Sequence, residues 1–320
     1  MLTRRTVLIS LAVLVAGLAL AAQEATLSGP ISGFVFDSGS RSVRAIMGLP
    51  GAAYLGDPLL ADLEWASVAP NGAVALAVKD GRWYAVRGLA AGANWTELGS
   101  SLPAPEKAAW SPDASAAVVA SGGGLRFFRN LPEGPVASAT AELPGPVTAL
   151  ALEASGECAV VTVKAEAAGG VYLACPDTPA RLLAAGDPSA LALARGGRDL
   201  FVADRSGRIL EIQDFRDAAR VMPFAEMPGP GWDPVGLAVS PDQRYLWVAH
   251  GSEKRVDGFE LESRALTGQL GVEGEPSMLE PLAIKSVFLL RSTGRAGEPL
   301  LVLEAGGQPA VYFVPAGRGE

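Results

Sequence analysis

One pattern recurs along this chain at intervals of about 42 residues. Its clearest copies span residues 110–120 and 239–249, and both place Ser-Pro-Asp before a short apolar segment. Successive copies, counted from the residue before the turn, lie 42, 42, 41, 46 and 42 residues apart. The residues counted in this way are Ala69, Ser111, Glu153, Ala194, Ser240 and Leu282. One further step back reaches Leu27 and the apolar segment 31–36, so the spacing predicts seven repeats.

The sixth repeat is the most complete, and its pattern fits four strands. We expect strands over 235–239, 244–249, 256–261 and 265–270, with a turn at Pro241 and Asp242 between the first two. Four strands in about 42 residues leave no room for a helix. A period of 40 to 45 residues made of short strands is typical of a β-propeller. The sequence therefore predicts an all-β fold, a single β-propeller of seven four-stranded blades.

The first repeat is the weakest of the seven. It offers strands over 31–36, 42–47 and 52–55, and its innermost strand would have to come from residues 23–29. Otherwise the ring closes without that strand. The alternative is a ring of six blades with an N-terminal hairpin added to the closing sheet.

The chain begins with two arginines, an apolar run over 7–20 and small residues that end at Ala21 or Ala22. This order predicts a cleaved signal peptide over 1–21 and a propeller domain over 22–320. The apolar run of 14 residues is shorter than the roughly 18 to 20 that a membrane-spanning helix needs. Residues 3–8 also resemble a twin-arginine export motif, so both export routes stay open. We expect a periplasmic or extracellular protein with no membrane span after cleavage.

Charge and composition narrow the classes of partner. The formal net charge is −8, and it becomes −10 when the leader takes Arg4 and Arg5 away. An acidic protein repels nucleic acid over its average field. Charged residues make up 19% of the chain and hydrophobic residues 49%, which fits strands packed between neighbouring sheets and argues against disorder.

Both cysteines, Cys158 and Cys175, fall in the fourth repeat. We expect them on neighbouring strands, 157–164 and 169–175, joined by a short loop. Pairing Lys164 with Gly169 in an antiparallel hairpin places the two cysteines opposite each other. The pattern favours a cross-strand disulfide, with two buried free thiols as the alternative.

The repeat resembles that of bacterial YVTN-type propellers. The residues that carry the resemblance are the turn Ser240-Pro241-Asp242, the aromatic-rich strand that follows it, and the later segment 258–261. The resemblance implies a propeller of the kind found in surface-layer proteins, lactonase-like enzymes and periplasmic scaffolds. This chain departs from the pattern because Ala114 and Gln243 stand where those repeats have glycine after Pro-Asp. The signature of WD repeats, Gly-His before a strand and Trp-Asp at its end, is absent, and we transfer nothing from that family.

Propellers bind ligands where one set of loops converges on the axis. By analogy with that fold, we expect the loops between second and third strands to share this face with the connections between blades. These loops mix cations, a few carboxylates and one tryptophan, which suits a carboxylate, a peptide or a sugar. The candidate ligand-binding residues are Arg82, Asp204, Arg205, Arg208, Trp232, Asp233, His250, Lys254, Arg255 and Arg291.

The sequence contains no assembled catalytic motif. His250 is the only histidine, so a multi-histidine zinc site is excluded, and no Gly-x-Ser-x-Gly elbow occurs. His250 ends a predicted strand, where a hydrogen-bonded structural role is the ordinary interpretation. Weak metal-ligand candidates are Asp80, Asp204 and Asp233. We expect no cofactor.

Three functions stay open at this point. The leading hypothesis is a secreted, non-catalytic propeller that binds a protein or peptide partner through its loop face. The second is a metal-dependent, lactonase-like hydrolase, which would need Asp80, Asp204 and Asp233 close together. The third is a small-molecule or glycan sensor that uses Trp232 and the nearby arginines.

Overall fold

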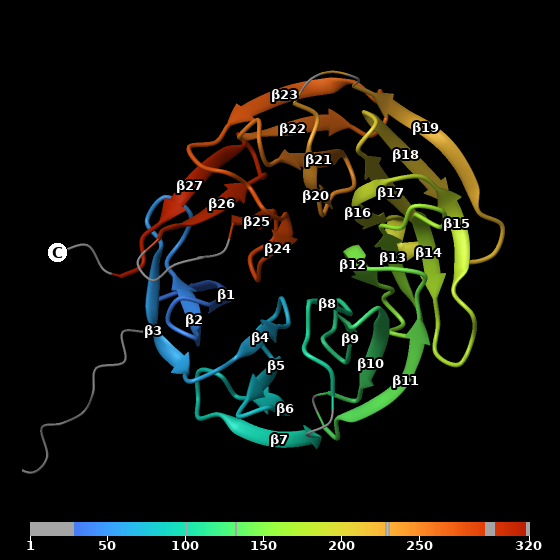
Figure 1. Cartoon of the computed structure of the whole chain (residues 1–320). Coiled ribbons are helices and arrows are strands. Elements are labelled where there is room, and N and C mark those ends of the chain that lie inside the picture. The colour runs from blue at the N-terminus through green and yellow to red at the C-terminus, as the bar shows by residue number, and fades with distance from the viewer. Residues whose placement is uncertain are drawn as a thin grey trace, which may run out of the picture. The chain divides into compact units, whose positions relative to one another are not determined.

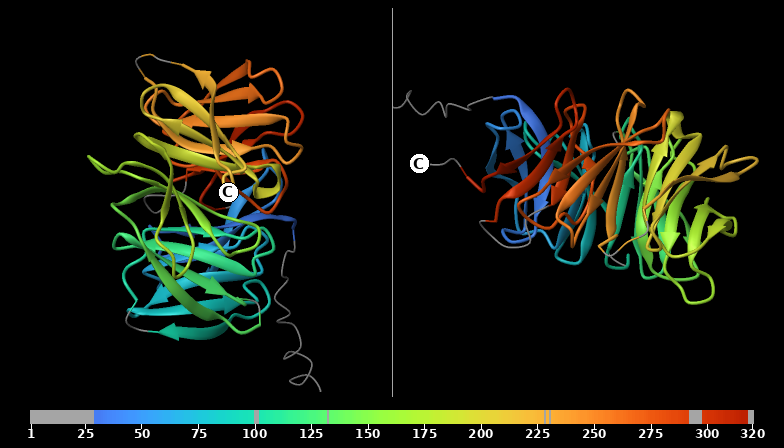
Figure 2. Two further views of the ribbon diagram at one scale, coloured as in Figure 1. Left: turned by 90° about the vertical axis from the view of Figure 1, so that its right-hand side faces the viewer. Right: turned by 90° about the horizontal axis from the view of Figure 1, so that it is seen from above.

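The computed structural model describes residues 29–99, 102–131, 133–227, 229, 231–291 and 298–317. Ile31–Glu320 form one compact unit, in which seven antiparallel sheets stand around a common axis (Figure 1). In side view the strands run between the two faces of this ring (Figure 2). Each sheet is one blade, and the blades follow one another in chain order. The predicted all-β propeller with seven blades is confirmed.

Blades 2 to 7 have four strands each, and the strand nearest the axis comes first in the chain. Blades 2 to 4 contain β4 (Trp65–Val68), β5 (Val74–Lys79), β6 (Arg82–Arg87) and β7 (Asn94–Gly99); β8 (Lys107–Trp110), β9 (Ala116–Ser121), β10 (Gly124–Arg129) and β11 (Val136–Glu142); and β12 (Val147–Leu152), β13 (Ala159–Val163), β14 (Gly170–Ala174) and β15 (Arg181–Ala185).

Blades 5 to 7 repeat this order, with one turn of 3-10 helix, η1 (Arg195–Gly197), inserted in blade 5. They contain β16 (Pro188–Ala194), β17 (Asp199–Asp204), β18 (Arg208–Gln213) and β19 (Arg220–Glu226); β20 (Pro234–Val239), β21 (Tyr245–His250), β22 (Arg255–Glu260) and β23 (Leu266–Gly271); and β24 (Glu280–Pro281), β25 (Val287–Arg291), β26 (Leu300–Glu304) and β27 (Ala310–Val314).

Blade 1 has three strands among the described residues: β1 (Ile31–Asp37), β2 (Ser42–Met47) and β3 (Tyr54–Leu60). They match the second, third and fourth strands of the other blades. After β1, the carbonyl of Arg41 accepts a hydrogen bond from Leu63 N, as the Lys254 carbonyl does from Val272 N in blade 6. Residues 23–28, in which the sequence places the innermost strand, lie outside the described residues.

The third strand of blade 1 begins later than the sequence suggests. The sequence predicts a strand over 52–55, but the structure has β3 over Tyr54–Leu60. The chain turns between Leu49 and Ala52, where Ala52 N donates to the Leu49 carbonyl. Gly48 and Gly51 adopt positive φ in this turn, which an extended strand does not allow.

Apolar side chains between neighbouring blades form the core. Seven clusters of buried residues occur among the described residues, one at each contact between blades. The cluster between blades 7 and 1 closes the ring, and it packs Leu300 and Val302 against Val35 and Ile46. The second strands are buried on both faces, as β13 illustrates, in which all five residues are buried and only Thr162 is polar.

The turns after the innermost strands explain a feature of the repeat. In blades 2, 3, 4 and 6 the fourth residue of this turn has positive φ: 70° at Gly72, 61° at Ala114, 69° at Gly156 and 57° at Gln243. Glycine reaches this conformation without strain, whereas other residues meet a steric cost. The two departures from glycine therefore sit in the same backbone conformation as the glycines of the other turns.

The disulfide between Cys158 and Cys175 is present, as predicted. Ala159 pairs with Ala174 and Val163 with Gly170, so the hairpin has the expected register. The two strands are three and two residues shorter than predicted, and the cysteines flank them. The described residues include no helix of a length and hydrophobicity that could cross a membrane.

Candidate functional site

The loops between second and third strands lie beside the connections between blades. Backbone hydrogen bonds join the two sets: Met227 N donates to the Gly207 carbonyl in blade 5, and Leu143 N to the Gly123 carbonyl in blade 3. The predicted sharing of one face is confirmed. We call this face the loop face, and the face with the other turns the turn face.

A cavity of about 510 Å³ opens around the axis toward the loop face. We call it the axial funnel. Blades 2 to 7 line it with residues of their innermost strands or of the segments just before these strands, on the loop-face side. Blade 1 contributes Phe34, Val35 and Phe36 of β1 and the following Ser38. Its volume falls within the range of about 300 to 1,000 Å³ that is usual for ligand sites.

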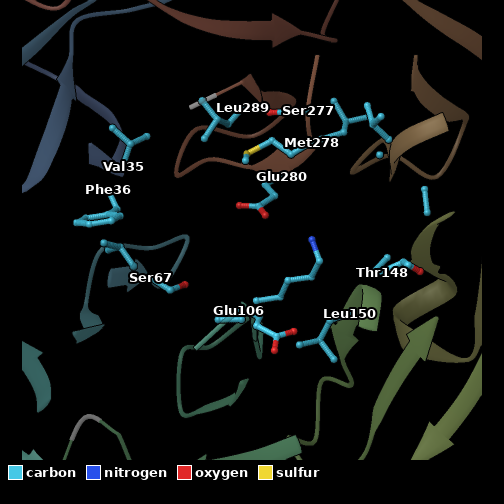
Figure 3. A pocket seen from close by; sticks show the side chains of 18 of the residues that line it. Val35, Phe36, Ser67, Glu106, Thr148, Leu150, Ser277, Met278, Glu280 and Leu289 are labelled. Atoms are coloured by element: carbon cyan, nitrogen blue, oxygen red, sulfur yellow. The ribbon is translucent and has the colours of Figure 1, made fainter. Parts of the chain in front are cut away.

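Two charged side chains in the funnel stand apart from its apolar and hydroxyl-bearing walls. Lys107 begins β8 and Glu280 begins β24, on different sides of the axis. The Glu280 carboxyl extends into the middle of the cavity, below Met278 (Figure 3). Among the described residues, neither the ammonium of Lys107 nor the carboxyl of Glu280 has a hydrogen-bond or ion-pair partner within contact distance. Unpaired groups of opposite charge in a cavity are available to a ligand.

Enclosure by the surrounding strands changes the acidity of Glu280. Its side chain is accessible within the cavity, although protein atoms surround it. Burial raises the pKa of the Glu280 carboxyl, and the positive charge of Lys107 opposes this rise. The neighbouring Glu106 is different, because its Oε1 accepts a hydrogen bond of 3.1 Å from Gly122 N in its own blade.

Gly236 allows the segment before Glu280 to approach the axis. A Cβ atom at residue 236 would lie 2.5 Å from the backbone nitrogen of Leu279 and 2.8 Å from the carbonyl carbon of Met278. Such distances are far below van der Waals contact. On its other side the segment is held by Ser277 N and Met278 N, which both donate to the Leu290 carbonyl. Glycine at residue 236 therefore permits the position from which Glu280 enters the funnel.

None of the predicted loop residues is among those that line the funnel, and most of them are engaged with their own neighbours. Asp204 accepts hydrogen bonds from Ser206 and from the backbone of Arg208, whose guanidinium lies 2.6 Å from its Oδ2. Burial alone would raise the pKa of Asp204, but the hydrogen bonds from Ser206 and Arg208 outweigh it and lower that pKa. Asp204 and Arg208 thus stabilise one tight turn.

Other predicted cations have carboxylate partners. Arg205 lies 3.7 Å from Asp187 and 3.8 Å from Asp233 across the connection to the next blade. The Arg82 guanidinium lies 3.1 Å from Glu97, in an exposed pair. Exposed pairs of this kind contribute little to stability, about 0 to 1 kcal/mol.

Lys254, Arg255 and Arg291 complete the predicted cations. Arg255 contacts Glu253 at 3.2 Å and the buried Asp257 at 3.1 Å. Lys254 is exposed. The Arg291 side chain lies near Gly274, and its buried Nε has no hydrogen-bond partner among the described residues.

His250 and Trp232 are structural in this arrangement. His250 is fully buried, and its Nε2 lies 3.0 Å from Oδ2 of Asp257. The Trp232 ring packs on it with 4.9 Å between ring centroids, and the indole N–H donates to the Asp204 carbonyl at 2.6 Å. Burial alone would raise the pKa of Asp257, but the partners His250 and Arg255 outweigh it and lower that pKa. His250 ends β21 in this contact with Asp257, but neither of its ring nitrogens has a partner in hydrogen-bond geometry among the described residues.

The three proposed metal-ligand carboxylates do not form a common group. Asp80 belongs to the loop of blade 2, Asp204 to the loop of blade 5, and Asp233 to the connection between blades 5 and 6. Within the described ranges, no group of three His, Cys, Asp or Glu side chains is close enough to hold one metal ion.

Lys107 and Glu280 are absent from the predicted site, because they begin innermost strands and do not belong to the loops. A signal did exist, since both are charged residues that begin an innermost strand. At the start of the innermost strands of blades 4, 5 and 6 the chain has Val147, Pro188 and Pro234. A charge at such a position faces either the axis or a neighbouring blade, and only the folded ring shows which.

Neither a scan against protein-family models nor a search of curated protein sequences finds a match. Solved structures share the fold. The chain is similar to a functionally unknown protein from Desulfotomaculum acetoxidans (TM-score 0.65, 12% identity, 91% of this chain and 98% of that chain).

Two further structures are similar to the chain. One is described as a putative 6-phosphogluconolactonase from Bacteroides fragilis (TM-score 0.64, 14% identity, 91% of this chain and 98% of that chain). The other is the β-propeller domain of Myceliophteria thermophila Cps50 (Swd1) (TM-score 0.59, 12% identity, 81% of this chain and 88% of that chain). At these identities the similarity shows the β-propeller fold, and the fold hosts many activities.

Proposed function

We propose that this chain is an exported, non-catalytic β-propeller that binds a peptide segment of a partner protein in the axial funnel. The observation that carries this proposal is the pair of unpartnered charges, Lys107 and Glu280, inside an open cavity on the loop face. A peptide segment can offer a carboxylate to Lys107 and a hydrogen-bond donor or cation to Glu280. The apolar walls around them accept its side chains.

The rigid ring favours binding over chemistry. Clusters of buried residues between the blades hold the funnel walls in place, so a peptide meets a preorganised surface. The hydrolase hypothesis needs several carboxylates around one cation, and Asp80, Asp204 and Asp233 come from separate loops. The sensor hypothesis needs Trp232 for a ligand, but its N–H already donates to the Asp204 carbonyl.

Two further parts of the proposal concern the export of the chain and the type of its repeats. Residues 1–21 would act as a cleaved signal peptide, and a disulfide between Cys158 and Cys175 is consistent with an oxidising compartment such as the periplasm or the cell exterior. We also assign the repeats to the YVTN type. The left-handed conformation at Ala114 and Gln243, where that repeat has glycine, supports this assignment.

The test is a cross-linking pull-down from the native envelope with the exported chain as bait. The test variant exchanges the funnel charges, Lys107→Glu with Glu280→Lys. The matched control, Lys285→Glu with Glu262→Lys, exchanges two exposed charges in turns of the turn face and keeps the same net charge. We expect a partner that the native chain and the control recover and the funnel variant loses.

Recovery of the same proteins by all three baits would refute the proposal. Neutralising Arg208 and Arg255 would be a poorer test. Both guanidiniums pair with buried carboxylates, so their loss would disturb the loops themselves.

A further inference from the structure

A second cavity of about 450 Å³ lies between blades 6 and 7 at the turn face, separate from the axial funnel. We call it the interblade groove. Blade 6 contributes the turn that precedes β21, the first part of β21, and β23. Blade 7 contributes Ser286 and the turn 305–309. The two blades are neighbours in the ring (Figure 1).

Two aromatic rings line the groove. Tyr245 and Trp247 have ring centroids 5.9 Å apart and planes inclined by 35°. Gly258 on the next strand makes room for the indole, since a Cβ atom there would lie 2.6 Å from Cζ3 of Trp247. Trp247 is only 4% exposed, and its Nε1 has no hydrogen-bond partner among the described residues.

An unsatisfied buried donor is costly, by about 1 to 3 kcal/mol, and native proteins contain few of them. The indole N–H of Trp247, one of the residues that line the groove, would regain a partner if binding brought a ligand acceptor within reach of it. This donor is therefore an independent indication of a binding site, in addition to the cavity.

The rim of the groove carries one charge of each sign. Asp242 Oδ1 accepts hydrogen bonds from the Ser240 hydroxyl and from Arg244 N, and these bonds lower the pKa of Asp242, so it remains a carboxylate at neutral pH. The Arg244 guanidinium lies over the Tyr245 ring, 5.6 Å from its centroid, and among the described residues it has no carboxylate within ion-pair distance. An anion would be repelled by Asp242, and a cation by Arg244.

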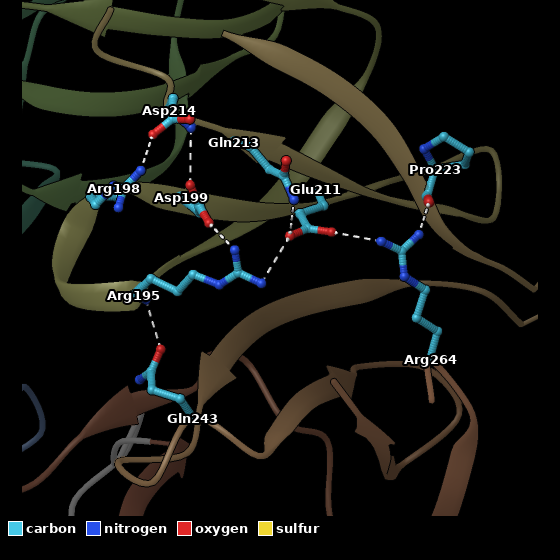
Figure 4. A network of polar contacts seen from close by, with 9 residues as sticks. All are labelled: Arg195, Arg198, Asp199, Glu211, Gln213, Asp214, Pro223, Gln243 and Arg264. Carbon is cyan, nitrogen blue, oxygen red and sulfur yellow. Dashed lines mark hydrogen bonds and ion pairs between the residues drawn. The ribbon is translucent and has the colours of Figure 1, made fainter. Parts of the chain in front are cut away.

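The turn that carries these charges is held from its other side. Arg195 N donates to Gln243 Oε1 at 2.7 Å, and Arg195 also pairs with Asp199 at 3.1 Å (Figure 4). Arg264 joins blade 6 to Glu211 of blade 5 in the same network. The network fixes the turn against blade 5, so the face that it turns to the groove is preorganised.

We infer that the interblade groove binds a neutral hexopyranose ring, either free or as one residue of a glycan. Vicinal hydroxyls can donate to Asp242 and accept from Arg244 at the same time. The C–H groups of the ring pack against the partly exposed Tyr245, and a ring or hydroxyl oxygen that reaches the buried Trp247 Nε1–H can accept from it. Because the rim offers both the Asp242 carboxylate and the Arg244 guanidinium, it favours a neutral ring that carries both hydrogen-bond donors and acceptors.

The experiment records the indole N–H signals in ¹H–¹⁵N spectra of the ¹⁵N-labelled exported chain. The Trp247 signal is assigned from a Trp247→Phe variant. The probes are a panel of methyl hexopyranosides and disaccharides, with acetate, methylammonium and cyclohexanol as an anion, a cation and an apolar ring. We expect at least one sugar to shift the Trp247 signal with millimolar affinity, and the three other probes to leave it unchanged.

Two variants locate the site. Arg244→Ala should weaken sugar binding at least fivefold, whereas Arg220→Ala, an exposed arginine on the outer strand of blade 5, should leave it unchanged. Sugar binding should also persist in the funnel variant, which separates this inference from the proposed function. A shift caused by acetate instead of sugars, no shift with any sugar, or equal affinity in the Arg244→Ala variant would each overturn the inference.

Discussion

The disulfide offers a prediction whose magnitude follows from the structure. Replacing both Cys158 and Cys175 with alanine removes a crosslink between residues 17 apart in sequence. In the chain-entropy model, closing a loop of this size restricts the unfolded chain by about 3 kcal/mol at 25 °C. At about 2.1 cal/mol/K per residue, the unit Ile31–Glu320 unfolds with an entropy of about 0.6 kcal/mol/K, so 1 kcal/mol corresponds to about 1.6 °C of melting temperature. We expect the variant to melt about 5 °C below the native chain.

Differential scanning calorimetry of the oxidised native chain, the reduced native chain and the double variant gives the measurement. The reduced chain keeps both sulfur atoms, so it separates the loss of the crosslink from the loss of packing around the buried Cys158. The reduced native chain and the double variant should each lose most of the roughly 3 kcal/mol that the crosslink contributes. A decrease of less than 2 °C in either sample would refute the reasoning that the crosslink restricts the unfolded chain.

Further predictions concern the funnel, the buried ion pair and the turns. Gly236→Ala should destabilise the chain by about 1 to 3 kcal/mol and reduce partner recovery, because the new methyl group collides with Leu279; unchanged pull-down and melting would contradict this. Asp257→Asn should cost roughly 3 kcal/mol in urea titrations at pH 7. The pKa of Asp257 is lower in the folded chain than the value of about 3.9 in the unfolded chain. The charged carboxylate therefore stabilises the fold fully above this unfolded pKa, and the stabilisation is lost as pH falls through the folded pKa. The free energy of unfolding of the native chain, but not that of the variant, should lose this contribution below about pH 4. Gly156→Ala should cost more than Gly307→Ala in thermal melts: both have positive φ, 69° and 65°, but only the first added Cβ meets another blade.

The repeat predicted the ring because each blade follows from local rules. A proline and an aspartate end one strand, an apolar run starts the next, and the copies about 42 residues apart must stack to bury both faces. The register of the cysteine hairpin was predictable for the same reason, since one short loop fixes which residues face each other. The weakness of the first repeat was also visible, and the three described strands of blade 1 correspond to the three segments that the sequence offered.

The site was less predictable because it depends on which charges lack partners in the folded chain. The loops of blades 5 and 6 contain most of the predicted candidates. Asp204 and Arg208 form a hydrogen-bonded turn, and His250 forms a buried pair with Asp257. Residue type and loop position do not distinguish such groups from ligand-binding groups. The distinction requires distances across strands and between blades.

The two candidate sites combine a cavity with charged or polar groups that lack protein partners among the described residues. Charges that belong to the architecture have partners: Arg205 pairs with two aspartates, and Glu211 with two arginines. In the funnel, Lys107 and Glu280 face a cavity from different blades without contact. In the interblade groove, an indole N–H has no acceptor beside a carboxylate and a guanidinium that do not form an ion pair with each other. A buried donor without an acceptor costs free energy, so the Trp247 N–H favours a ligand that supplies an acceptor. Lys107 and Glu280 are exposed in the funnel and are available to a ligand without that cost. The pull-down and the sugar titration test separately whether the axial funnel and the interblade groove each bind a ligand.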